Sequence, residues 1–253
     1  MLEILNLKYF NDYNAQLSFE WYLPDAQQSI LTTDSFGFYT SVSSVYSSKI
    51  EGEDIDLNSY LKHRFKNSPF LPDYTKKIDD LFDAYSFAKN QKLSLGNLLE
   101  AHKLISKNLL KSVHRGRIRS EMEYILNEEG QIEYIAAAPN IVKSETQKLF
   151  SDIENLLQEN LNIQEIFYFA SYIHLVFLKI HPFADGNGRS ARLLEKWFLA
   201  QKLGEKAWFI PSEKYYYDNL RSYYKNIHIG LDYESLNYDR ILPFLLMLPQ
   251  CIK

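Results

Sequence analysis

The segment HPFADGNGRSAR, from His181 to Arg192, gathers within twelve residues several groups that can do chemistry. It holds one of the six histidines and two of the nine glycines of the chain, together with an aspartate, an asparagine and two arginines. An imidazole can accept a proton near neutral pH, and guanidinium groups bind phosphate oxygens in pairs. These residue types indicate a general base beside a phosphate-binding loop.

The two glycines of the segment mark the start of a helix whose backbone amides can bind an anion. Because GNG opens this helix, the first N–H groups lack partners inside it. Gly186 and Gly188 let a ligand approach the backbone closely, and the positive end of the helix dipole favours phosphate. Arg189 and Arg192 are three residues apart and therefore neighbours on one helix face. Together these features predict a site for several linked phosphates.

Asp185 is a carboxylate beside this predicted phosphate site. Phosphates repel it unless a hard cation such as Mg²⁺ lies between them, so Asp185 is expected to bind the metal. His181 then lies at the mouth of the site, where general base is its natural role. Each residue also has a structural interpretation, since a lone histidine is often structural and Asp185 could cap a helix. The prediction depends on the combination of residues.

Two other phosphate-binding patterns do not fit. GNGRSA satisfies the loose dinucleotide pattern G-x-G-x-x-A, but that fingerprint requires a preceding strand. The preceding residues 163–180 instead carry an apolar stripe at helical spacing. The P-loop pattern G-x-x-x-x-G-K-[ST] does not occur.

Two helices of the core are expected to position the loop. The apolar stripe over 163–180 predicts the first, and Pro182 disfavours helical geometry at His181, so that this helix ends there. A second apolar helix is predicted over 188–202. The other expected elements are helices at 76–88, 93–110, 144–159, 212–228 and 238–248, a helix of about ten residues ending near 51, a bend at 65–74 and a β-hairpin over 121–136. Residues 1–35 give only weak signals.

The composition is that of an ordinary soluble protein, with 46% hydrophobic and 24% charged residues among 253. A net charge of −4 disfavours long nucleic acid as a partner. The single Cys251 cannot form an internal disulfide, which fits a reducing compartment. The N-terminus lacks the basic region of a secretory signal, and no apolar run approaches the ~20 residues of a membrane helix. A cytoplasmic protein without a membrane partner is expected.

HPFADGNGRSAR resembles the signature of the Fic family, H-P-F-x-[DE]-G-N-G-R-x-x-R, and matches every fixed position. The segments LLEAHKLI (98–105) and YYDNL (216–220) agree with it, and the resemblance covers roughly residues 90–245. It implies an all-α, Fic-type helical core with one small β-hairpin. The domains expected from it are an N-terminal region, 1–90, with an inhibitory helix at about 40–52, and a Fic domain, 91–253.

The resemblance also implies an activity, the transfer of AMP from ATP to a Ser, Thr or Tyr hydroxyl of a target protein. The roles that it assigns are proton acceptor for His181, Mg²⁺ ligand for Asp185, phosphate binding for Asn187 and the amides around Gly186 and Gly188, binding of the β- and γ-phosphates for Arg189 and Arg192, and a nucleoside pocket for Tyr216 and Tyr217. The hairpin 121–136 resembles the flap that clamps the target by strand pairing. A purely structural hairpin is the alternative.

The earlier segment SSKIEG (47–52) is similar to the family's inhibitory motif, [ST]-x-x-x-E-[GN], through Ser47, Glu51 and Gly52. A glutamate in the last turn of a helix opposes the dipole by roughly 0.3–1 kcal/mol, which suggests a partner for its carboxylate. The resemblance names Arg192, which would then be withdrawn from the γ-phosphate. Alternatively, Glu51 is solvated and Gly52 is a simple helix cap.

A self-inhibited protein adenylyltransferase is therefore the leading hypothesis. The same fold could instead transfer UMP, phosphocholine or a phosphate, or remove AMP with Glu51 activating water. A non-enzymatic alternative is a nucleotide-binding regulatory module whose site is permanently blocked. The sequence is compatible with a homo-oligomer and does not identify the target protein or the role of residues 1–40.

Overall fold

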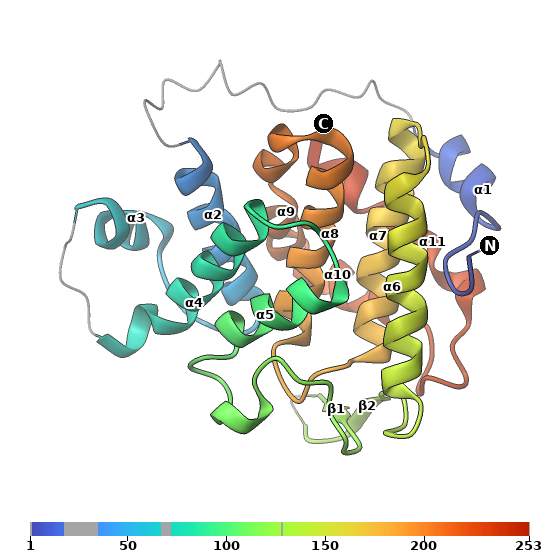
Figure 1. The fold of residues 1–253 in the computed structure, drawn as a ribbon, viewed down its shortest axis with the longest axis horizontal. Helices are drawn as coiled ribbons and strands as arrows, with labels where there is room; N and C mark the ends of the chain where they lie inside the picture. Colours follow the sequence, from blue (N-terminus) through green and yellow to red (C-terminus); the bar gives the residue numbers. More distant parts are fainter. Residues whose placement is uncertain (1, 18–34, 67–71, 128, 253) are drawn as a thin grey trace.

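The computed structural model describes residues 2–17, 35–66, 72–127 and 129–252, and within them the chain is mostly helical with one two-stranded hairpin (Figure 1). The predicted all-α class with a small hairpin is confirmed. The predicted bend at 65–74 and the weak signals of 1–35 lie partly outside the described residues. The α-helices are α1 (Phe10–Ala15), α2 (Ser35–Ile50), α3 (Leu57–Lys66), α4 (Pro72–Lys89), α5 (Leu95–Ile105), α6 (Val142–Gln158), α7 (Ile163–Ile180), α8 (Asn187–Leu203), α9 (Ser212–Asp218), α10 (Leu220–Ile227) and α11 (Leu242–Leu245). Short 3-10 helices are η2 (Ser112–His114), η3 (Glu205–Phe209), η4 (Tyr238–Arg240) and η5 (Leu248–Ile252).

Helices α7 and α8 pack against each other at the centre of the molecule, as their apolar stripes predict. At the start of α7, Asn162 and Glu165 form a capping box, in which each side chain accepts from the other residue's backbone N–H. The helix ends at Ile180, and His181 adopts a left-handed conformation. The expected effect of Pro182 on the helix end is thus confirmed. The loop 181–186 between the helices is thereby fixed at both ends.

The expectation that no apolar segment approaches the length of a membrane helix is not met by α7. By length and composition it is the one helix, among the residues that the structure describes, that could cross a bilayer. Tyrosine, serine and histidine interrupt its apolar run but leave a mean hydropathy of 1.2. Since 83% of it is buried inside the protein, it has the surroundings of a core helix.

Several element boundaries differ from the sequence-based expectations. Helix α2 is 16 residues long instead of about ten, although it ends at Ile50 as expected, with Gly52 at φ +86° behind it. The short helices α1 and α3 were not predicted. The expected helix 212–228 is divided into α9 and α10 at Asn219, and 238–248 contains η4 and α11. Short polar helices carry little periodicity, which explains why the pattern misses them.

A buried ion pair fastens α2 to the rest of the fold. Lys196 on α8 and Glu213 on α9 lie 2.5 Å apart, and both are almost fully buried. Ser43 on α2 accepts from the Lys196 ammonium and donates to the Glu213 carboxylate, at 2.6 and 3.0 Å. Tyr85 on α4 donates to the other oxygen of Glu213 at 2.5 Å. Four helices therefore meet at one polar cluster, which fixes the position of α2 beside α8.

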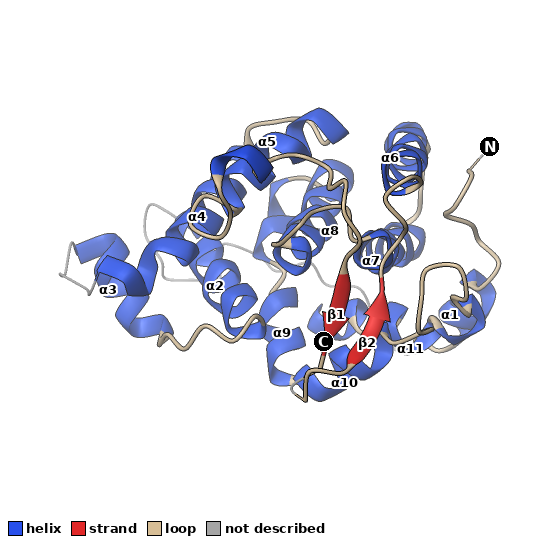
Figure 2. Cartoon of the chain, turned by 90° about the horizontal axis from the view of Figure 1, so that it is seen from below, coloured by secondary structure: helices blue, strands red, loops and turns tan. Residues whose placement is uncertain are grey.

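The hairpin consists of β1 (Tyr124–Leu126) and β2 (Ile132–Ile135), paired antiparallel with an irregularity after Ile125. It lies near the C-terminal end of α7 (Figure 2). There the Tyr134 hydroxyl donates to the Lys179 carbonyl at 2.7 Å. The outer edge of β2 is partly covered, since Ile135 exchanges backbone hydrogen bonds with residues 231 and 233. No described residue pairs with the outer edge of β1.

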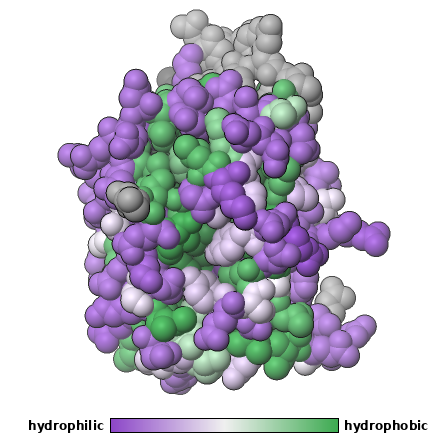
Figure 3. Space-filling view, turned by 90° about the vertical axis from the view of Figure 1, so that its right-hand side faces the viewer, coloured by the Kyte–Doolittle hydropathy of each residue, from purple (hydrophilic) through white to green (hydrophobic). Residues whose placement is uncertain are grey.

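One hydrophobic core includes residues from Leu5 to Ile252, on both sides of the predicted domain boundary at residue 90, which stays a prediction. The N-terminal residues 3–5 join this core through the buried Asp152, whose carboxylate accepts their three backbone N–H groups at 2.7–2.8 Å. On the face that carries α1 and α6, hydrophilic side chains surround smaller groups of apolar ones (Figure 3). Such a mixed surface is ordinary for a folded domain.

Candidate active site

Arg119, which precedes the hairpin, binds the backbone at the start of the loop between α7 and α8. Its guanidinium donates to the carbonyls of His181, Glu121 and Ala137 at 2.6–2.8 Å, and to that of Ile180 at 3.3 Å. The carbonyls at the end of α7 lack partners in the helix, and Arg119 supplies them. It thereby joins the base of the hairpin to the backbone of His181. Arg119 was not predicted from the sequence as a residue of the site.

His181 is prepared to act as a base through one nitrogen. Its Nδ1 lies 3.2 Å from the carbonyl of Leu178, and because a carbonyl only accepts, Nδ1 carries the proton. The Nε2 atom of the neutral ring is therefore free to accept a proton. Burial lowers the pKa of His181 from 6.5 to about 4, although the hydrogen bond to Leu178 acts in the opposite direction. The residue is partly exposed and lines a cavity of about 530 Å³, so it is not sealed off from solvent.

His102 on α5 supports the same loop from the opposite side. Its Nε2 donates to the Asp185 carbonyl, and its Nδ1 accepts from the Gly116 backbone N–H, both at 2.9 Å. The ring stacks on Phe183, with centroids 3.6 Å apart. Gly186 passes close to this ring with a φ of +77°, a conformation that favours glycine. His102 lies within the predicted helix 93–110, but this role was not predicted, because a hydrogen bond to a backbone carbonyl leaves no signal in the sequence.

Acid is expected to destabilise the fold through His102. Burial lowers its pKa from 6.5 to about 4, so the unfolded chain takes up a proton at a pH where the folded protein does not. This contribution to the free energy of unfolding is complete above pH 6.5 and is lost as the pH falls toward 4, by up to about 3 kcal/mol. We expect His102→Gln, which keeps a donor and an acceptor, to lose less stability than the wild type between pH 7 and 4.5 in urea titrations. Equal losses in the two proteins would contradict this assignment.

The N-terminus of α8 presents free backbone amides. Gly186 is its N-cap, and no side chain of the described residues caps the helix. The Asn187 side chain accepts from the Phe183 N–H at 2.9 Å and donates to the Phe183 carbonyl at 2.7 Å, so it shapes the loop. The predicted contribution of Asn187 to phosphate binding can therefore come only from its backbone. An anion here would meet the first amides of the helix.

Arg189 is nearly fully buried at the start of α8, yet its guanidinium is only partly satisfied. Its NH2 atom lies 3.5 Å from a carboxylate oxygen of Glu53, which in turn accepts from Lys77 at 2.5 Å. Its Nε atom has no hydrogen-bond partner among the described residues. A buried guanidinium N–H without an acceptor is costly, and phosphate oxygens would supply one. Sequence reasoning did not single out Glu53.

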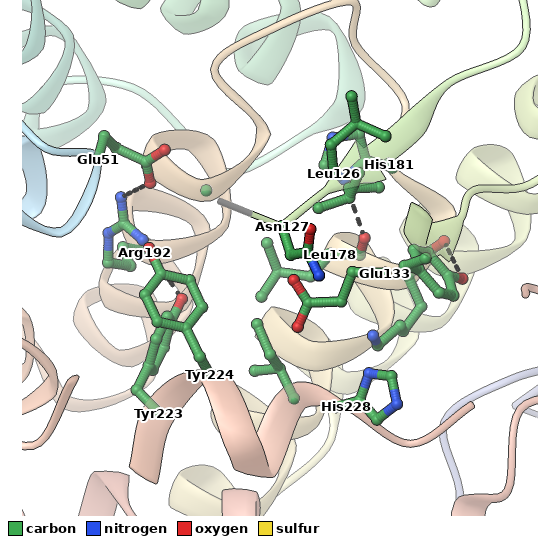
Figure 4. A pocket seen from close by; sticks show the side chains of 15 residues that line it. Glu51, Leu126, Asn127, Glu133, Leu178, His181, Arg192, Tyr223, Tyr224 and His228 are labelled. Carbon is green, nitrogen blue, oxygen red and sulfur yellow. Dashed lines mark hydrogen bonds and ion pairs between the residues drawn. The ribbon is translucent and has the colours of Figure 1, made fainter. Parts of the chain in front are cut away.

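Arg192 is bound on several sides by the end of α2. Its NH2 atom donates to Glu51 at 2.5 Å (Figure 4). The same atom donates to the Ser47 carbonyl at 3.0 Å, and Nε donates to the Ser47 hydroxyl at 2.8 Å. Burial opposes ionisation of Glu51, but Arg192 and Arg189 hold its pKa below the ordinary value. The predicted contact between Glu51 and Arg192 is therefore present, and the residues of the SSKIEG motif provide it.

The Glu51 carboxylate also lies directly above Gly188. A Cβ atom added to Gly188 would be 2.3 Å from an Oε of Glu51, so the glycine permits this approach. Gly188 is the second residue of α8, where an anion is favoured. The carboxylate thus occupies space next to the free amides that a phosphate group would need.

A buried polar chain supports Arg192 from behind. Its NH1 atom donates to the Tyr223 hydroxyl at 3.3 Å, and that hydroxyl is 3.0 Å from His174 Nε2. Nδ1 of His174 is 2.8 Å from the carboxylate of Glu195, which also accepts from Tyr216. This chain fixes one end of the guanidinium independently of Glu51. Sequence reasoning missed Tyr223, because nineteen tyrosines make any single one inconspicuous.

The two predicted nucleoside-pocket residues, Tyr216 and Tyr217, lie outside the cavity that His181 lines. Tyr216 is fully buried against Glu195, and Tyr217 packs on Tyr46 of α2, with centroids 5.5 Å apart. Neither lines the cavity. The chain changes direction at Asn219, between α9 and α10, so the next pair of tyrosines reaches the cavity instead.

The cavity has a volume of about 530 Å³ and extends from the end of α2 to the hairpin (Figure 4). This volume is within the usual range for small-molecule sites. His181, Gly188, Arg192 and Glu51 all line it. The other lining residues are Ile125, Leu126, Asn127, Glu133 and Tyr134 of the hairpin, Leu178 and Lys179 of α7, and Tyr223, Tyr224, Ile227 and His228 of α10 and its end.

Asp185 is an exposed residue of the loop, and one of its carboxylate oxygens accepts from the Gly186 N–H at 2.6 Å. Among the described residues no group of three or more His, Cys, Asp or Glu could hold a metal by itself. Mg²⁺ typically binds through one or two carboxylates together with substrate phosphates. A single accessible carboxylate next to a phosphate site fits that mode, so Asp185 is compatible with a metal that arrives with its nucleotide.

Comparison with known proteins relates this geometry to a family. Residues 92–199 match the model of the Fic/DOC family. The chain is 26% identical over 163 residues to "Protein adenylyltransferase Fic" of Nematostella vectensis, which covers 64% of this chain and 33% of that protein. It is also 26% identical over 142 residues to "Protein adenylyltransferase fic-1" of Caenorhabditis briggsae, covering 56% and 25%. The chain thus spans a quarter to a third of the length of these curated relatives.

Solved structures share the fold at low sequence identity. A Fic family protein from Desulfovibrio desulfuricans superposes with a TM-score of 0.74 at 21% identity, over 97% of this chain and 71% of that one. Residues 134–508 of Fic-1 from Caenorhabditis elegans give a TM-score of 0.64 at 17% identity, over 96% and 67%. The likeness therefore extends beyond the matched segment to almost the whole described fold.

Proposed function

Residues 92–199 of this chain form a Fic domain, and from that premise we propose a function. The chain transfers AMP from ATP to a hydroxyl group of a protein. Helix α2 inhibits this transfer. The printed names of its relatives support nucleotidyl transfer. The arrangement of His181 beside the free amides of α8 supports the same reaction. One observation carries the proposal. The amides at the start of α8 lie between His181, whose Nε2 is free to accept a proton, and the buried Arg189, whose Nε has no hydrogen-bond partner among the described residues.

In this proposal His181 removes the proton from the acceptor hydroxyl. Nε2 accepts that proton as the hydroxyl oxygen bonds to the α-phosphorus, and the bond from that phosphorus to the β-phosphate oxygen breaks. The hydrogen bond from Nδ1 to Leu178 keeps the ring in the required orientation and stabilises it when it becomes positively charged. The low pKa of His181 keeps the imidazole neutral at physiological pH until the proton arrives.

The leaving pyrophosphate is bound by the start of α8. The amides of Asn187, Gly188 and Arg189 face the phosphates, and the unsatisfied Nε of Arg189 donates to one of them. Arg192, once released by Glu51, donates to the γ-phosphate. A Mg²⁺ ion on Asp185 would neutralise charge on the α- and β-phosphates. Transfer of this kind depends mainly on positioning and charge neutralisation, and this loop supplies both.

We further propose that the contacts made by Glu51 and Glu53 inhibit the reaction. Glu51 holds Arg192 and occupies the space above Gly188, and Glu53 approaches Arg189. Both arginines of the motif are thus engaged by the segment that follows α2. Nucleotide that binds against this arrangement cannot engage both arginines, so its γ-phosphate lies in an unproductive position.

The target protein is proposed to bind along β1. Its outer edge is unpaired in the described part of the chain, and a peptide can add to such an edge through main-chain hydrogen bonds. Tyr124 and Leu126 on this strand are exposed, which leaves apolar side chains for the partner to cover. The partner is therefore recognised mainly by its backbone, close to His181.

Labelled nucleotide tests the type of group transferred. We expect Glu51→Gly, incubated with Mg²⁺ and ATP, to incorporate label from the α-phosphate into itself or into an added protein, and no label from the γ-phosphate. Intact-mass measurement should show the added mass of AMP. Hydroxylamine should not release it, because AMP on a hydroxyl group is attached through a phosphodiester. Label from the γ-phosphate alone would indicate a kinase-like reaction, and release of AMP from a modified target would indicate the reverse activity. Either result would overturn the proposal.

A further inference from the structure

Lys179 is a buried cation in the cavity that the proposed chemistry does not use. It lies in the last turn of α7, two residues before His181, and only 4% of it is exposed. It lines the same cavity as His181. Its ammonium has no hydrogen bond or ion pair to any described residue, and its Nζ lies 4.1 Å from the centroid of the Tyr134 ring.

Such an ammonium calls for an acceptor. Burial lowers the pKa of Lys179 to about 8, although Glu133 acts in the opposite direction, so the group still carries its charge at neutral pH. The Tyr134 ring compensates the charge only in part. Buried charges in proteins are normally paired, and an unpaired one inside a ligand cavity indicates that the ligand supplies the partner. A further hydrogen-bonding group, the carboxylate of Glu133, lines the cavity nearby.

The positions of Lys179 and Glu133 in the cavity indicate which part of a nucleotide they contact. The phosphates are accounted for by α8 and Arg192, at the side of the cavity nearer to α2. The wall near Lys179 includes Leu178, its neighbour in the chain, and Tyr134, with Ile125 opposite Tyr134 in the hairpin. Apolar and aromatic side chains suit the faces of a planar base, whose edge then needs a donor and an acceptor. Figure 4 shows Glu133 beside Leu178, pointing into this part of the cavity.

We propose that Lys179 and Glu133 bind the edge of the nucleobase and so determine which nucleotide the site accepts. The assignment rests on the proposed use of ATP. Adenine carries an amino group at C6, which donates to the Glu133 carboxylate, and ring nitrogens, one of which accepts from the Lys179 ammonium. Lys179 and Glu133 are therefore specificity-determining residues, separate from the groups that bind the phosphates and move the proton.

Calorimetry that compares ATP with inorganic tripolyphosphate tests this inference in the Glu51→Gly background. We expect Lys179→Met to weaken ATP binding by about ten- to a hundredfold, the usual effect of losing a hydrogen bond to a charged group, and to leave tripolyphosphate binding within about threefold. Glu133→Gln, on an exposed strand position, should weaken ATP by about two- to tenfold, and should not weaken purine riboside triphosphate, which lacks the amino group. Lys107→Met, an exposed lysine outside the cavity, is the matched control.

The outcomes separate this inference from the proposed function. If Lys179→Met weakens both ligands equally, Lys179 is a phosphate contact, and if it weakens neither, it has no role in binding. Either result overturns the base-binding assignment while leaving AMP transfer intact. If the Glu51→Gly parent binds tripolyphosphate but not ATP, the proposed function itself fails, together with the inference that rests on it. Retained tripolyphosphate binding also shows that Lys179→Met is folded. If Lys179→Met does not fold, the comparison of ATP with tripolyphosphate is made with Glu133→Gln instead.

Discussion

Replacing Glu51 with glycine is expected to raise the rate of AMP transfer by roughly ten- to a hundredfold over the wild type. The change frees Arg192, whose NH2 atom lies 2.5 Å from the Glu51 carboxylate, to donate to the γ-phosphate. A hydrogen bond of this kind contributes about 1.5–3 kcal/mol, which sets the range. It also clears the space above Gly188. Incorporation of α-labelled AMP over time, at fixed Mg-ATP, measures the effect.

Asp54→Gly provides the matched control for this variant. Asp54 is an exposed acid in the same connection after α2, and it forms no ion pair with either arginine of the motif. We expect its rate to equal that of the wild type. If Glu51→Gly is no faster than the wild type while still binding ATP, the contact between Glu51 and Arg192 is structural and the inhibitory role is wrong.

Replacing His181 with alanine in the Glu51→Gly background is expected to reduce transfer by roughly 10²–10⁴-fold, the usual contribution of a general base. ATP affinity should stay within about threefold, because the amides of α8 and Arg192 bind the phosphates without His181. Single-turnover incorporation of label gives the rate, and calorimetry gives the dissociation constant. The pair of measurements separates a chemical role from a binding role.

The exposed His114, outside the cavity, is the control position, and His114→Ala should retain full activity. A loss of ATP binding as large as the loss of rate would show that His181 is a ligand contact. Unchanged transfer would show that another group accepts the proton. Both results would contradict the proposed mechanism.

Local patterns in the sequence were sufficient to predict the framework of the site. The apolar stripe of α7, the effect of Pro182 and the glycines of the loop each act over a few neighbouring residues, and all three appear in the structure as expected. The same is true of the end of α2 before Gly52. Contacts that depend on local geometry leave a periodic or positional signal, which a single sequence contains.

The supporting residues could not be predicted, because they reach the site from distant segments. Arg119 and His102 hold the loop through backbone carbonyls, and any residue can present a carbonyl. Tyr223 was hidden among similar residues. The break between α9 and α10 at Asn219, which brings Tyr223 and Tyr224 to the cavity in place of Tyr216 and Tyr217, has no clear signal in the sequence. The unpaired state of Lys179 depends on what surrounds it in three dimensions, and no spacing in the sequence encodes it.

The most direct test of the account is the structure of Glu51→Gly with Mg²⁺ and a non-hydrolysable ATP analogue. We expect the β- and γ-phosphates on the first amides of α8 with Arg189 and Arg192, and the α-phosphorus facing Nε2 of His181. The base should lie between the hairpin and α10. A nucleotide bound elsewhere, or one whose α-phosphorus lies away from the imidazole, would contradict it.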